Sequence, residues 1–246
     1  MSRHGGGSCS RIVPPRSPLR LLVIPVTCSW EPVPIARFLR VVSFEPLGPD
    51  SPLDAALRDA VVPRLLGRPA IVDAWIGRHG SSTDRTRVLA TTWIDEPGIG
   101  PPDLAALADL ALADGTMEIR SIEHLGLVVH ARFDRPEPAR ILRIFRGEVL
   151  AGEIDAYVHE ARTGMLADAA VNEGLIAFAL GIDGADTFLT VSAWTGWSAI
   201  EAATGGNTRQ PFSTRNSARL AGFTVGHYEI LPETPDRRTD SVPDAS

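Results

Sequence analysis

The sequence predicts an α+β fold built from two successive βαββαβ units, on three observations. Strand and helix patterns recur in the same order in the two halves of the chain. Two landmarks match in register, Gly77 with Gly181 and Trp93 with Trp194, each pair about one hundred residues apart. A segment rich in proline and charge, Arg135–Pro138, separates the halves and is typical of a linker.

In the first half, apolar residues recur at helical spacing from Leu53, and Gly67 with Pro69 end that helix. A turn rich in Ser, Thr, Asp and Gly joins two strand-like runs and indicates a hairpin. A second helix begins after two prolines and ends at Gly115. The expected elements are a strand Arg37–Phe44, a helix Leu53–Leu66, strands Ala70–Gly77 and Arg87–Trp93, a helix Pro102–Asp114 and a strand Ile119–Phe133.

The second half repeats this order. Its long helix is apolar along one face from Ile154 to Ala169, and Gly174 stops it. The turn Asp183–Asp186 joins the strands of a second hairpin. The expected elements are a strand Ile141–Val149, a helix Glu153–Asn172, strands Leu175–Gly181 and Phe188–Trp194, a helix Trp197–Ala203 and a strand Phe223–Leu231.

A βαββαβ unit folds as a ferredoxin-like sandwich, in which two helices cover one face of a four-stranded antiparallel sheet. The other face is left apolar and must be buried, so we expect the two sheets to cover each other within one body. The predicted domains are 35–134 and 139–232, between a disordered leader, 1–34, and a disordered tail, 233–246.

Composition excludes several classes of protein. The net charge of −6 disfavours binding to nucleic acid, and no apolar run approaches the roughly 18 residues that span a membrane. The two cysteines, Cys9 and Cys28, lie close together near the start of the chain, which fits a reducing compartment. We therefore expect a cytoplasmic protein.

The second half resembles the antibiotic biosynthesis monooxygenase-like family of dimeric α/β barrels. The residues that carry the resemblance are Ile144–Gly147, Tyr157 on the helix, and Ser192–Trp194 followed by Trp197. The first half is similar but keeps little beyond Trp93. The resemblance implies two antiparallel sheets packed as a dimeric-α/β-barrel-like body, with the chain either a monomer that is an internal pseudo-dimer or a homodimer.

We select three residues as catalytic, namely His227, Tyr228 and Arg143, and three as contacts to substrate, namely Trp194, Phe145 and Trp197. His227 and Tyr228 are neighbours on the last strand, so one faces each side of the sheet, and a histidine there is either a satisfied core donor or a proton shuttle.

The remaining interpretations stay open. A buried Arg143 needs an acidic partner or an anionic ligand. Trp194 is either a core aromatic or a pocket wall. The glycine-rich loop 204–211 is a surface loop or a pocket lid.

Two functions follow from this selection. The first is a monooxygenase that needs no cofactor or metal and acts on a small aromatic or polyketide-like substrate; such chemistry requires an apolar pocket, a base and a donor that stabilises an anion. The second is a small-ligand-binding or structural protein without turnover. Haem degradation is disfavoured, because that subgroup pairs an Asn on the first strand with a Trp and a nearby His, whereas this strand offers Arg143 or Phe145. A cavity bounded by Trp194, His227 and Arg143 favours the enzyme, whereas a solid core there contradicts it.

Overall fold

A computed structural model describes residues 36–48, 50–95, 104–108, 117–184, 186–213 and 215–231. The predicted leader and tail lie outside the described residues. So does most of the predicted helix Pro102–Asp114, of which residues 104–108 are described and helical.

The first half contains four strands and one long helix interrupted by a π-helical turn. The strands are β1 (Phe38–Pro46), β2 (Ile71–His79), β3 (Arg87–Trp93) and β4 (Met117–Arg132). The helix runs through α1 (Asp50–Ala56), the π turn (Leu57–Val61) and α2 (Val62–Leu66).

The second half follows the same order. Its strands are β5 (Ile141–Val149), β6 (Leu175–Asp183), β7 (Thr187–Trp194) and β8 (Leu220–Ile230). Its long helix runs through α4 (Ile154–Glu160), a π turn (Ala161–Met165) and α5 (Leu166–Ala170), and the short helix α6 (Trp197–Ala203) follows β7. A 3-10 turn (Ser217–Arg219) leads into β8.

The eight strands form one closed antiparallel barrel in the order β1-β3-β2-β8-β5-β7-β6-β4. Each half supplies four neighbouring strands, in the orders β4-β1-β3-β2 and β8-β5-β7-β6, which is the sheet order of a ferredoxin-like unit. The predicted α+β fold class is therefore confirmed. The sheets also pair along both edges, through β4 with β6 and β2 with β8.

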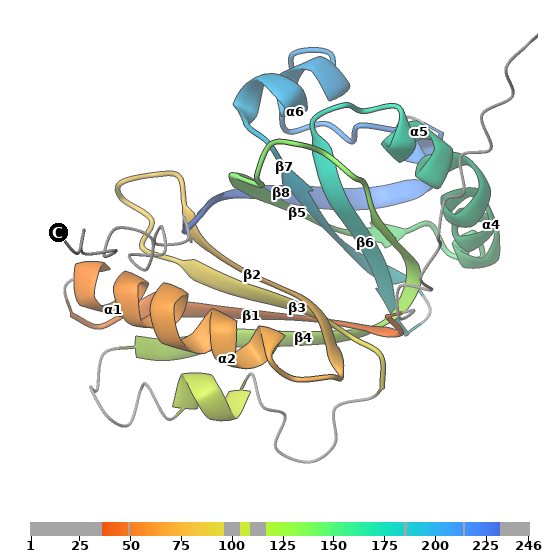
Figure 1. Cartoon of the computed structure of the whole chain (residues 1–246). Helices are drawn as coiled ribbons and strands as arrows, with labels where there is room; N and C mark the ends of the chain where they lie inside the picture. Colours follow the sequence, from red (N-terminus) through yellow and green to blue (C-terminus); the bar gives the residue numbers. More distant parts are fainter. Residues whose placement is uncertain are drawn as a thin grey trace, which may run out of the picture. The chain divides into compact units, whose positions relative to one another are not determined.

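Three apolar clusters hold the fold together. One lies between the first sheet and α1–α2, one between the second sheet and α4–α6, and one inside the barrel. Figure 1 shows the first helices over the outer face of β1–β4 and the later helices over the outer face of β5–β8. No helix in the described part of the chain has the length and apolar character to cross a membrane.

The glycines that match between the halves lie where the two sheets join. A Cβ atom on Gly77 of β2 would lie 2.8 Å from Cβ of Tyr228 on β8, and one on Gly181 of β6 would lie 2.7 Å from Cβ of Leu125 on β4. Each glycine therefore lets the last strand of the other half approach closely enough to pair.

Candidate functional site

The site in the second half begins with the alternation of side chains along β5. Arg143 and Phe145 point toward the helices, and Ile144 between them points into the barrel. Antiparallel pairing then places His227 of β8 beside Arg143, because partners in register share a face of the sheet. Ser192 of β7 lies on the other side of Arg143.

Arg143 is a buried cation with unusual partners. Its side chain is 2% exposed, and Nη2 donates to the carbonyl oxygens of Gln210 at 2.5 Å and Thr208 at 3.3 Å. No carboxylate of the described residues pairs with it. Burial lowers the pKa of Arg143 to about 10, so it stays charged at neutral pH. Its observed partners are therefore backbone carbonyl oxygens of the connection that follows α6.

His227 lies at the edge of the same face. Burial, together with the positive charge of Arg143, lowers the pKa of His227 to about 4, so the ring is neutral at pH 7. The backbone of Thr208 accepts a hydrogen bond from the ring, whereas the buried Nε2 has no partner among the described residues. The half-exposed Trp197 covers it, with 4.9 Å between ring centroids.

A small cavity of about 20 Å³ lies between the sheet and the long helix. Its lining combines apolar side chains with the polar groups of Arg143, Tyr157, Thr190 and Asn216. Asn216 donates to the carbonyl oxygen of Tyr157 at 3.2 Å, but its buried Oδ1 has no partner in the described part of the chain. The cavity has room for roughly one water molecule.

The cavity does not meet the criterion stated for the enzyme, which is a cavity bounded by Trp194, His227 and Arg143 together. It reaches Arg143 and Phe145 but is not lined by Trp194, Trp197 or His227. Trp194 is fully buried beside it, and its Nε1 donates to Oγ of Ser192 at 2.8 Å.

Tyr228 lies apart from the other selected residues. Because it follows His227 on β8, its side chain points into the barrel, where it belongs to the interior cluster. There it lies beside Arg146, which pairs with Glu123 of β4 at 2.6 Å. Of the six selected residues, Arg143, Phe145, Trp194 and His227 share the helix-facing side, and Trp197 reaches His227 from α6.

The first half offers an internal comparison, because its strands and helix match those of the second. On the helix, Leu53 occupies the position that matches Tyr157. On the sheet, Leu89 occupies the position that matches Thr190, because Leu89 pairs with Val42 as Thr190 pairs with Phe145. Both leucines are buried in the apolar cluster of the first half. The hydroxyl groups of Tyr157 and Thr190 therefore have no counterpart at the matching positions of the first half, whereas Arg143 has one in the buried Arg40 of β1.

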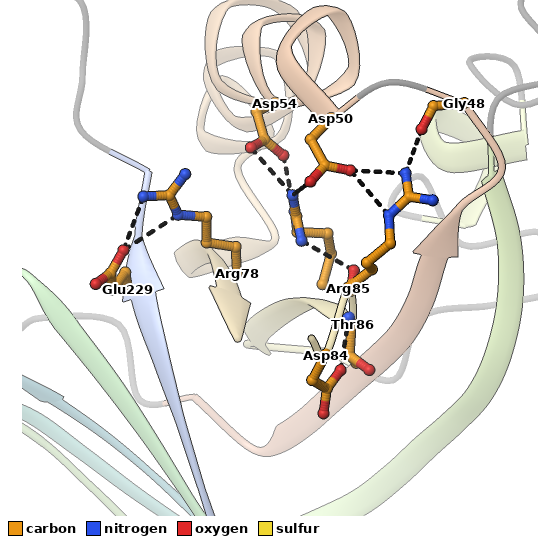
Figure 2. A network of polar contacts seen from close by, with 9 residues as sticks. Gly48, Asp50, Asp54, Arg78, Asp84, Arg85, Thr86 and Glu229 are labelled. Carbon is orange, nitrogen blue, oxygen red and sulfur yellow. Dashed lines mark hydrogen bonds and ion pairs between the residues drawn. The ribbon is translucent and has the colours of Figure 1, made fainter. Parts of the chain in front are cut away.

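A network of ion pairs holds the outer end of the first half. Asp50 and Asp54 of α1 face the arginines of β3 and its preceding turn (Figure 2). The buried Arg87 contacts Oδ1 of Asp54 at 2.8 Å and Oδ2 of Asp50 at 3.4 Å. Hydrogen bonding from Arg85 lowers the pKa of Asp50. Arg78 on β2 also pairs with Glu229 on β8 at 2.9 Å, across one join of the barrel (Figure 2).

Sequence reasoning missed three groups of the site: Thr190, Asn216 and Phe212. A position-by-position comparison of the halves finds Thr190, because a leucine stands in its place in the first half. Asn216 and Phe212 have no such signal, since they belong to the long connection between α6 and β8. Among the described residues, no group of three or more His, Cys, Asp or Glu side chains gathers to hold a metal ion.

A closed barrel of two ferredoxin-like sheets, each backed by helices, defines the structural class of this chain, and solved structures resemble it in shape. A candidate monooxygenase from Fusobacterium nucleatum subsp. nucleatum is 12% identical with a TM-score of 0.62, over 80% of this chain and 93% of that one. A candidate monooxygenase from Lactobacillus acidophilus is 9% identical with a TM-score of 0.62, over 80% and 95%. A candidate chlorite dismutase is 10% identical with a TM-score of 0.54, over 81% and 96%.

No protein-family model matches the chain, and no curated protein matches it. The likeness to the solved structures therefore shows the fold alone.

Proposed function

We propose that this chain is a cofactor-independent monooxygenase of the antibiotic biosynthesis monooxygenase-like type, which acts on a small aromatic substrate in its second half. The observation that carries the proposal is the pair of Arg143 and His227. A buried cation that no described carboxylate neutralises lies beside a neutral imidazole with a free acceptor nitrogen. Two solved neighbours described as candidate monooxygenases share the fold and lend it support.

The chemistry follows from these two groups. Nε2 of His227 accepts a proton from an acidic C–H or O–H group of the substrate, and the guanidinium of Arg143 stabilises the resulting anion. The electron-rich anion then reduces molecular oxygen. For a ring methylene, one oxygen atom becomes the new carbonyl and the other leaves as water with the two hydrogens.

The low pKa of His227 keeps its ring neutral in the free protein, and we expect this pKa to change when substrate binds. In the free protein, burial and Arg143 keep the ring unprotonated and ready to accept a proton. An anion at Arg143 offsets the positive charge that His227 feels. We therefore expect the pKa of His227 to rise as the substrate ionises, which favours the transfer.

Oxygen uptake tests the proposal. The full chain is incubated in air with hydroquinone and with anthrone, and wild type is compared with His227→Ala. We expect His227→Ala to lose about 10²- to 10⁴-fold in rate, the usual contribution of a general base. His124→Ala is the matched control, because His124 pairs with Arg40 on β1 as His227 pairs with Arg143 on β5. Equal uptake in wild type and His227→Ala removes His227 from the mechanism.

A second candidate function is ligand binding without turnover. The observation in its favour is the cavity, which at about 20 Å³ admits no organic substrate in the present conformation. If the chain only binds, small aromatic anions raise its melting temperature while oxygen uptake stays at the level of buffer for every substrate.

A further inference from the structure

The connection between α6 and β8 inserts an aromatic side chain beside the cavity. The ring of Phe212 lies edge-on to Phe178 at 5.5 Å and to Trp194 at 6.0 Å, and Phe212 also lines the cavity next to Arg143. The same connection supplies the two carbonyl oxygens, of Thr208 and Gln210, that Arg143 contacts. The same segment therefore supplies both an aromatic ring beside the cavity and the hydrogen-bond acceptors of Arg143.

The helix explains why there is room for this ring. At four matching positions the first half has Leu53, Leu57, Val61 and Leu65, whereas the second half has Tyr157, Ala161, Met165 and Ala169. Two leucines are thus replaced by alanines on the face that packs against the sheet. In the second half, Phe212 packs against the apolar cluster that contains these two alanines.

The connection has few hydrogen bonds to the sheet and the helices. Gly205 and Gly206 at its start have positive φ angles of 65° and 88°, and from Thr208 to Gln210 its polar contacts outside its own turn go to Arg143 and His227. Beyond Phe212 the chain is fixed again, since Ser213 donates to Asp168 on α5 at 2.6 Å. The part able to leave is therefore 205–212.

We propose that Phe212 and the carbonyl oxygens of Thr208 and Gln210 occupy the positions that the ligand takes when it binds. We propose further that this ligand is a compact aromatic anion of about one ring. Its ring takes the position of Phe212 between Phe178 and Trp194, and its oxygens take the position of the carbonyls at Arg143. The inference rests on the site of the proposed function and names its ligand class. A benzene-sized ligand needs a cavity of about 150 Å³, far above the present volume, so Phe212 must leave first.

Ligand chemistry follows from the two contacts. A neutral aromatic molecule fills the ring position but leaves the charge of Arg143 uncompensated. A saturated carboxylate reaches Arg143 but loses the edge-to-face contacts with Phe178 and Trp194. The site therefore selects for the combination of a flat ring and a negative charge.

The test is calorimetric titration of the full chain with benzoate, with benzamide and cyclohexanecarboxylate as matched probes. Phe212→Ala is expected to bind benzoate at least tenfold more tightly than wild type, because no ring has to be displaced. Arg143→Met is expected to lose benzoate binding, and Arg143→Lys to retain part of it. Phe38→Ala in the first half and Arg146→Met on the opposite face of β5 are expected to bind as wild type does.

Folding of each variant is checked by thermal unfolding, and Phe212→Leu, which keeps an apolar side chain, is expected to show an intermediate affinity. Benzoate affinity that is unchanged or weaker in both Phe212 variants overturns the inference, as does equal binding of benzamide. Oxygen uptake measured on the same samples separates the two claims. If oxygen uptake depends on His227 but benzoate does not bind, only the inferred ligand class is wrong. If benzoate binds tightly but no oxygen is taken up, only the proposed enzymatic activity is wrong.

Discussion

Arg143 and Arg87 are both buried arginines on central strands, yet their partners differ in kind. Arg87 contacts two carboxylates, whereas Arg143 donates to backbone carbonyls and lies over the ring of Phe145. An unneutralised buried charge costs free energy, so stability alone favours the arrangement of Arg87. The arrangement of Arg143 is the one that we propose serves an anionic ligand.

This contrast predicts different costs for removing the two charges. Arg87→Met leaves the largely buried Asp54 without its cation, and is expected to lower the free energy of unfolding by about 3–5 kcal/mol. Arg143→Met removes a desolvated charge that no acid among the described residues compensates, and is expected to cost less than about 1 kcal/mol. Urea unfolding of the two variants measures the difference. Equal losses would mean that Arg143 has a structural partner after all.

The pKa of His227 gives a prediction for pH. Its pKa falls from 6.5 in the unfolded chain to about 4 in the folded one, so between these values the unfolded chain binds the extra proton. Stability contributed by the neutral ring is therefore present above pH 6.5 and is lost as the pH falls toward 4. Comparing wild type with His227→Asn by urea unfolding at pH 7 and pH 4.5 isolates this effect. A difference between the two proteins that stays constant with pH contradicts the shift.

At the scale of elements, the two joins between the sheets depend on glycine. We expect Gly77→Ala and Gly181→Ala each to cost about 1–3 kcal/mol, because the added Cβ meets the Cβ of Tyr228 or Leu125. Gly126→Ala on β4 is the control, since a Cβ there meets nothing within 4 Å. Thermal unfolding gives the comparison. Losses no larger than that of the control would show that the strands at the joins can move apart without cost.

The same elements show how far the sequence could be interpreted. Period-two and helical spacing gave the strands within a few residues, with Ile141–Val149 and Arg87–Trp93 as predicted. The match of Gly77 with Gly181 was visible because a closed barrel needs a small residue at each join. The π turns inside both helices had no signal, since apolar spacing changes little when one residue is inserted into a turn.

The site was less predictable than the fold, for a physical reason. Alternation along a strand gives the face of Arg143, Phe145 and His227 once the helix layer is known. It gives nothing about the connection after α6, whose conformation depends on tertiary contacts such as that of Ser213 with Asp168. Phe212 of that connection lines the small cavity, and no sequence pattern places it there.

At the scale of the whole molecule, the two halves share a barrel and differ in what their helices cover. The first half packs leucines over its sheet and ties its outer end with ion pairs. The second half has hydroxyl and amide groups, a small cavity and a cation that pairs with no carboxylate of the described residues. One half supports the barrel, and the other is the half that we propose binds and converts the ligand.

The number of ligands bound per chain tests this division most directly. Equilibrium dialysis of the full chain against salicylate, a one-ring aromatic anion, is expected to reach one molecule per chain, and Arg143→Met is expected to bind none. Two equivalent molecules per chain, no binding by wild type, or one molecule that remains bound to Arg143→Met would contradict a single site in the second half.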